Sequence, residues 1–101
     1  MFANPNNRYI TSAIAEEVHV EIAQLIWRLI DSKKHRNIAL DYLQVFELKE
    51  CNGKQAIIHR QEVPEEKSFH LLPLKQALPI TRTIWCIDSG ETEMMLFPED
   101  Y

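Results

Sequence analysis

The sequence feature that most constrains the fold is Asn52-Gly53, which lies between two segments with the composition of β-strands. Residues 41–48 precede it and residues 55–61 follow it. The first segment contains Tyr42, Val45 and Phe46 and the second contains Ile57 and Ile58, which are residue types that favour strands. Asn-Gly readily supplies the two positive φ angles of a type I′ turn, so the pattern predicts a tight β-hairpin. Such a turn pairs Cys51 with Lys54 and thereby sets the register of both strands.

This register divides the hairpin into two faces with different roles. The face with Phe46 and Ile57 is expected to pack on a helix, with His59 as a buried core histidine rather than a catalytic base. The opposite face mixes apolar residues with an arginine and acidic residues, as interface cores do, and is the candidate partner surface. It comprises Leu43, Val45, Glu47, Ile58, Arg60 and Glu62. Cover by another segment, either residues 69–74 or the C-terminal hairpin, and cover by a partner or second subunit both stay open.

The other segments predict one helix and further short strands. Over residues 17–34, apolar residues recur at spacings of three and four, with acidic residues early and basic residues late, which indicates an amphipathic helix. Residues 84–87 and 93–96 flank Asp88-Ser89-Gly90-Glu91 and predict a second hairpin. The predicted fold class is therefore α+β, with one N-terminal amphipathic helix packed on an antiparallel sheet of five or six short strands built from two hairpins.

Length and charge limit the classes of protein to consider. A chain of 101 residues predicts a single domain over residues 1–101, with residues 1–7 expected to be poorly ordered. A formal net charge of −4 disfavours nucleic acid as a partner, because such binding needs a surplus of Lys and Arg. The sequence shows neither a signal peptide nor a long apolar run, which predicts no membrane association and a cytoplasmic location.

No residue pattern indicates catalytic chemistry, a cofactor or a metal site. With Gly53 and Gly90 as the two glycines, neither a phosphate-binding loop nor a nucleophile elbow can be written. The four histidines are scattered without metal-ligand spacing. Cys51 and Cys86 stand apart, which favours reduced thiols over a bridge between them.

By exclusion, the favoured function is a non-enzymatic binding or regulatory module that acts through the sheet face, with a protein partner or self-association. One alternative is a small-molecule-binding protein or small enzyme with a pocket between helix and sheet, using His59 with Gln44 or Gln61. Another is a structural homo-oligomer subunit.

Several stretches together resemble a known family. They are Arg8-Tyr9-Ile10-Thr11, residues 40–48, residues 57–62 with Pro64-Glu65, and Asp88-Ser89-Gly90-Glu91. They are similar to a small family of uncharacterised bacterial proteins of about this length, catalogued as a domain of unknown function. The resemblance implies a bacterial cytosolic protein and assigns no catalytic or binding residues.

Overall fold

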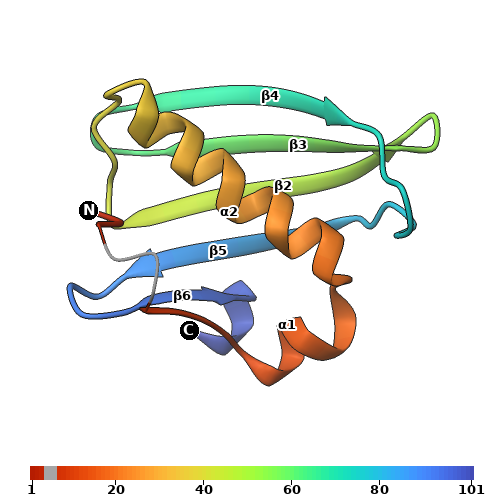
Figure 1. The fold of residues 1–101 in the computed structure, drawn as a ribbon, viewed down its shortest axis with the longest axis horizontal. Coiled ribbons are helices and arrows are strands. Elements are labelled where there is room, and N and C mark those ends of the chain that lie inside the picture. Colours follow the sequence, from red (N-terminus) through yellow and green to blue (C-terminus); the bar gives the residue numbers. More distant parts are fainter. Residues whose placement is uncertain (4–6) are drawn as a thin grey trace.

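The computed structural model describes residues 1–3 and 7–101, and its main layer is a six-stranded sheet (Figure 1). Helix α2 crosses one face of this sheet, and the shorter α1 lies near β6. The elements in chain order are β1 (Arg8–Ile10), α1 (Ser12–Glu17), α2 (Val20–His35), β2 (Leu43–Cys51), β3 (Lys54–Gln61), β4 (Glu66–Leu72), β5 (Arg82–Asp88), β6 (Glu93–Leu96) and the short 3-10 helix η2 (Pro98–Asp100). The predicted α+β fold class is confirmed.

The strands lie in the order β1-β6-β5-β2-β3-β4. Neighbouring strands are antiparallel except for β1, which pairs in parallel with β6 through Arg8 opposite Glu93. The sheet is therefore mixed where the sequence predicted a purely antiparallel one. A parallel neighbour needs a long connection, and here the connection between β1 and β6 is almost the whole chain.

Both predicted hairpins are present with the expected turns. Asn52 and Gly53 have φ angles of 51° and 78°, as a type I′ turn requires, and β2 pairs with β3 from Cys51 opposite Lys54 onward. The second hairpin joins β5 to β6, and Gly90 takes a φ of 99° in its turn, a conformation that side chains with a Cβ disfavour.

The predicted helix over residues 17–34 corresponds to α2, and the short α1 that precedes it was not predicted. The chain leaves helical geometry at Val18, whose φ and ψ are −112° and 120°, and α2 begins after His19. The imidazole Nδ1 of His19 accepts a hydrogen bond from the backbone N–H of Glu21 and so caps α2. Thr11 caps α1 in the same manner through its hydroxyl, which accepts from the backbone N–H of Ile14.

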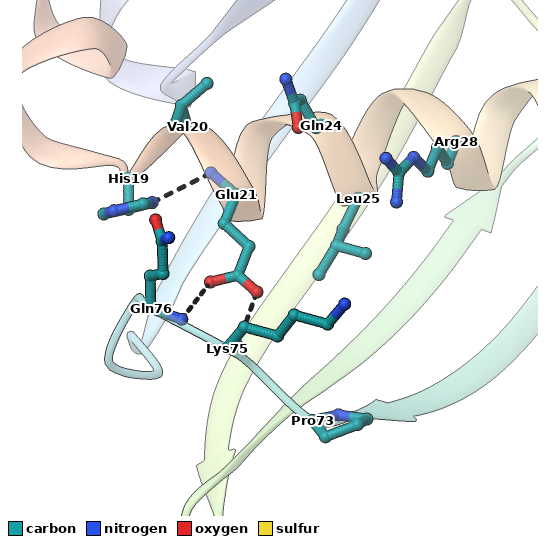
Figure 2. Close-up of a pocket in the computed structure, with 9 residues that line it drawn as sticks. All are labelled: His19, Val20, Glu21, Gln24, Leu25, Arg28, Pro73, Lys75 and Gln76. Carbon is teal, nitrogen blue, oxygen red and sulfur yellow. Dashed lines mark hydrogen bonds between the residues drawn. The ribbon is translucent and has the colours of Figure 1, made fainter.

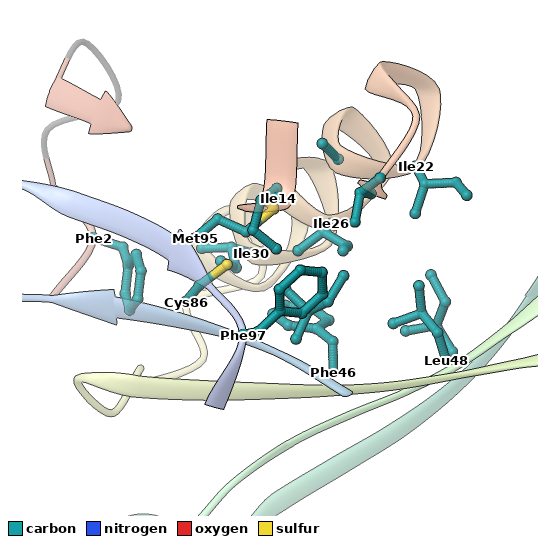
Figure 3. Packing of buried hydrophobic residues seen from close by; sticks show 14 residues of the cluster. Phe2, Ile14, Ile22, Ile26, Ile30, Phe46, Leu48, Cys86, Met95 and Phe97 are labelled. Atoms are coloured by element: carbon teal, nitrogen blue, oxygen red, sulfur yellow. The ribbon is translucent and has the colours of Figure 1, made fainter. Parts of the chain in front are cut away.

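The hydrophobic core lies between α2 and the sheet (Figure 3). The apolar stripe of α2 contributes Ile22, Ile26 and Ile30, and these side chains face Phe46 of β2 and neighbouring apolar residues of the sheet. Each of the four is fully buried, and burying a side chain of this size contributes about 1.5–3 kcal/mol. The core therefore fixes which face of the sheet is left for solvent or a partner.

Poor order over residues 1–7 stays a prediction, and part of this stretch contacts the folded domain. Residues 4–6 of that stretch lie outside the described residues. Phe2 is fully buried in the core, its backbone N–H bonds the Asp88 carboxylate, and its carbonyl accepts from Lys34 Nζ at 2.5 Å. Burial of an aromatic ring favours a fixed position for Phe2 over the usual fraying of a chain end.

Candidate functional site: the open face of the sheet

The face of the sheet opposite α2, here called the open face, carries rows of side chains from neighbouring strands. Residues directly opposite each other in a ladder share a face, so the registers define these rows. One row runs from Trp85 through Val45 to Arg60, and the next runs from Glu47 through Ile58 to Phe69. The residues of the open face used below are Leu43, Val45, Glu47, Ile58, Arg60, Phe69, Leu71, Trp85 and Ile87.

The open face is apolar over much of its width and partly exposed. Val45 at its centre is 4% exposed, whereas Phe69 and Leu71 on β4 are 64% and 43% exposed. Leu43, Ile58, Trp85 and Ile87 are half-buried by their neighbours on the sheet. Contiguous apolar surface of this kind is typical of interaction sites in folded proteins.

An ion pair lies among these apolar residues. Arg60 Nε is 2.7 Å from Glu47 Oε1, and 41% and 35% of the two side chains are exposed. The sequence placed Glu62 in the same cluster, but Glu62 is an exposed residue of the turn after β3, and no ion pair of Glu62 is found among the described residues. A half-exposed ion pair of this kind contributes about 0–1 kcal/mol to the stability of the fold. Its contribution to folding therefore does not explain its presence on this face.

The segments that were considered as cover for the open face lie beside it instead. Residues 69–72 belong to β4, and the C-terminal hairpin forms β5 and β6, so both extend the sheet edgewise. Within residues 1–3 and 7–101, neither α-helix and no strand lies over this face. From outside the sheet, the ring of Tyr101 packs edge-on against Trp85 on this face, with ring centroids 5.8 Å apart.

On the α2 side, His59 belongs to a hydrogen-bonded polar cluster inside the core. Its ring stacks on Phe46 with centroids 4.2 Å apart, and its Nε2 lies 2.7 Å from Gln44 Oε1. The Gln44 amide donates to Gln61 Oε1, and the Gln61 amide donates to the backbone carbonyls of Ala39 and Pro64. Gln44 and Gln61 are bonded to one another, to His59 and to the main chain, whereas Nδ1 of His59 has no hydrogen-bond partner among the described residues. A ligand pocket built on His59, Gln44 and Gln61 stays a prediction.

Burial determines the protonation of this cluster. Removal from water, together with the nearby positive charges of Lys33 and His70, lowers the pKa of His59 from 6.5 to about 3. Lys33 is 1% exposed, and its Nζ has no hydrogen-bond partner among the described residues. Burial lowers the pKa of Lys33 as well. A neutral, stacked, hydrogen-bonded His59 confirms the sequence-based expectation of a core histidine.

A cavity of about 350 Å³ lies where α2 begins, between the helix and the loop that follows β4 (Figure 2). The carboxylate of Glu21 reaches across this boundary and accepts backbone N–H bonds from Lys75, Gln76 and Ala77. These bonds lower the pKa of Glu21 from 4.5 to about 2. Glu21 therefore holds residues 75–77 against α2, and its carboxylate oxygens accept hydrogen bonds from the protein's own backbone. The sequence offered no signal for this contact between residues more than fifty positions apart.

Replacing Glu21 with Ala is expected to release residues 75–77 from α2, because three backbone N–H groups lose their acceptor. The protection of their amides, measured against the intrinsic exchange rate at each pH, should fall. In the wild-type protein the same loss of protection should appear as the pH falls from 4.5 towards 2 and protonates the carboxylate. The control is Gln24→Ala, an exposed change in the same helix and cavity wall. Equal protection in the two variants would refute this role of Glu21.

The thiols and acidic groups give no catalytic arrangement in the described residues. Cys51 and Cys86 are free, so the bridge between them does not form, and burial raises the pKa of Cys86 well above its ordinary value. Within residues 1–3 and 7–101, no group of three or more His, Cys, Asp or Glu side chains is placed to hold a metal ion. In the same part of the chain, no helix has both the length and the apolar character needed to cross a membrane.

The fold is a small α+β domain in which, over residues 1–3 and 7–101, neither α-helix and no strand covers the open face. The chain belongs to the family described as "Staphylococcal protein of unknown function (DUF960)", whose model matches residues 7–100. It is similar to a protein of unknown function from Enterococcus faecalis with a crystal structure: TM-score 0.84, 25% identity, 94% of this chain and 90% of that chain covered. A comparison with curated proteins gave no significant match.

Proposed function

We propose that this protein is a non-enzymatic binding module that docks a partner protein on the open face of its sheet. The observation that carries the proposal is that the face keeps its apolar residues while neither α-helix and no strand of the described chain packs on it. Its centre combines Trp85 and Arg60, residue types enriched at the energetic centres of interfaces. The partner surface that fits is an apolar patch with polar groups able to meet Glu47 and Arg60.

The charge arrangement also supports a protein partner over a nucleic acid. Arg60 is already paired with Glu47, and the formal net charge of the chain is −4. A phosphate backbone needs unpaired cations in excess, whereas a protein interface accommodates a matched ion pair within apolar surroundings.

The test replaces Ile58 with Ser and Arg60 with Ala in one tagged protein, expressed at its natural level in its native cells. Proteins that co-purify with the wild type are expected to be lost from this double variant, and the strongest of them should bind purified wild-type protein and fail to bind the purified variant. The control is Val20→Ser, because Val20 is an apolar residue that is 62% exposed at the start of α2, away from the open face.

Stability separates loss of a binding surface from loss of the fold. Both replaced side chains are partly exposed, so the melting temperature of the double variant should stay within about 5 °C of the wild type. Unchanged co-purification with the double variant would refute the proposal. So would a large drop in melting temperature with unchanged association, because the face would then serve the fold.

A further inference from the structure

β4 is an edge strand of the sheet. β4 is seven residues long, and within residues 1–3 and 7–101 it pairs with β3 alone, so one side of its backbone has no strand beside it there. The opposite edge strand, β1, is three residues long. A long edge strand is a template for pairing with another strand, and proteins with exposed edges either block them or use them.

The register identifies which backbone groups of β4 point outward. In an antiparallel ladder, alternate residue pairs exchange both of their hydrogen bonds, and a two-residue turn makes the pair beside it such a pair. Counting from Cys51 opposite Lys54, the odd-numbered residues of β2 bond towards β3 and the even-numbered ones towards β5. The bond from the Asp88 N–H to the Tyr42 carbonyl, on the β5 side, agrees with this count.

The same alternation continues from β3 into β4. Ile57 and His59 face β4, opposite His70 and Ser68, so these two β4 residues use their backbone groups inside the sheet. The N–H and C=O groups of the alternate residues Lys67, Phe69 and Leu71 therefore point to the free edge. Their side chains also share the open face, where Phe69 and Leu71 are well exposed.

This edge is complementary to a second copy of itself. With a two-fold axis at Phe69 and perpendicular to the sheet, Phe69 faces its own copy and Lys67 faces Leu71 of the partner, so all three outward N–H groups find carbonyls. A register centred on Lys67 would instead set two lysines opposite each other, which is unfavourable. A register centred on Leu71 would bring Pro73, which has no N–H to donate, opposite Phe69.

We infer that two copies of this chain associate through antiparallel pairing of their β4 strands, centred on Phe69. The two sheets then form one continuous sheet, and the axis keeps both open faces on the same side. The exposed rings of Phe69 form a cross-strand aromatic pair at the seam. An isologous contact of this kind closes after two copies and leaves the short β1 edges outside.

The first test measures mass in solution. The wild type is expected to have twice the 11.9 kDa mass of one chain in light scattering after size exclusion, and Phe69→Pro is expected to be a monomer. Proline at position 69 removes an N–H that points to the free edge, and it leaves the hydrogen bonds of His70 and Ser68 to β3 in place. Leu78→Ser, at a loop residue that is 84% exposed, is the control and should stay a dimer. A monomeric wild-type protein at every soluble concentration would overturn the inference.

The second test reads the register and does not depend on the folding of the proline variant. In a Cys51→Ser background, Phe69→Cys is expected to form an intermolecular disulfide under mild oxidation, because facing residues lie about 5.5 Å apart at Cα. Lys67→Cys alone should not cross-link, whereas a mixture of Lys67→Cys with Leu71→Cys should. Cross-linking by Lys67→Cys alone, or none by Phe69→Cys, would overturn the pairing. Neither outcome bears on docking at Ile58 and Arg60, whose own variants test that function.

Discussion

Lowering the pH from 6.5 to about 4 is expected to reduce the free energy of unfolding by roughly 3 kcal/mol through His59 alone. The pKa of His59 is about 3 in the folded protein against 6.5 for an exposed histidine, so the unfolded chain binds the proton more tightly. Stability from this residue is complete above pH 6.5 and is lost as the pH falls towards 3. Urea unfolding monitored by Trp fluorescence at a series of pH values measures the effect.

The His59→Gln variant isolates this contribution from that of the carboxylates. Glutamine keeps a donor for Gln44 and has no proton to take up in this range. The difference in unfolding free energy between wild type and variant should therefore change with pH along the titration curve of His59. Parallel pH profiles for the two proteins would mean that His59 takes up a proton without unfolding, and would contradict its burial as a neutral group.

Replacing Lys33 with Met is expected to raise the free energy of unfolding by roughly 1–3 kcal/mol at neutral pH. The Lys33 side chain is buried and its Nζ has no hydrogen-bond partner among the described residues, so the amine is desolvated and only the charge of Glu66 partly offsets the cost. Methionine keeps the unbranched shape and removes the polar atom. Chemical denaturation of both proteins provides the comparison.

The pH dependence supplies a second readout for Lys33. Burial lowers its pKa in the folded state, so the unfolded chain binds more protons and wild-type stability rises as the pH increases towards 10.5. The Lys33→Met variant should lack this contribution, and its advantage over the wild type should shrink in alkaline solution. Lys54→Met, at the exposed first residue of β3, is the control and should leave stability nearly unchanged. A destabilised Lys33→Met protein would show that the amine has a function in the folded core.

The parts of the fold that follow from local chemistry could be predicted from the sequence. Asn52-Gly53 predicts both the turn and the register, because the turn requires positive φ angles and its length sets the pairing. The stripe containing Ile22, Ile26 and Ile30 predicts the core face of α2 because its spacing matches the helical repeat. In both cases the residues that determine the local structure lie within about twenty positions of one another in the sequence.

The parts that depend on distant partners could not be predicted in the same way. The parallel pairing of Arg8 with Glu93 and the burial of Phe2 depend on where the far end of the chain lies. The burial of Lys33 contradicts the usual exposure of basic residues in the last turn of a helix, since the neighbouring strands reach that far. Tertiary packing overrides local preference at these positions.

In the candidate site, too, the parts set by local sequence patterns could be predicted and the parts set by distant contacts could not. Alternation along β2 and β3 places Leu43, Val45, Glu47, Ile58 and Arg60 on one face, and the registers confirm that placement. Glu62 was grouped with them because the strand was expected to continue, but β3 ends at Gln61. The hairpin pattern could not predict that residues 69–72 extend the sheet at its edge. A strand of this composition can either pair with the edge of a sheet or pack against its face.

The parallel pairing of β1 with β6 has a consequence for synthesis on the ribosome. β2, β3 and β4 are consecutive neighbours and can pair as soon as residue 72 has left the exit tunnel. β1 is made before the other strands described here, yet it joins the sheet through residues 93–95 of β6, which is made after all of them. The N-terminal segment can therefore join the sheet only after β6 has been made and has left the exit tunnel.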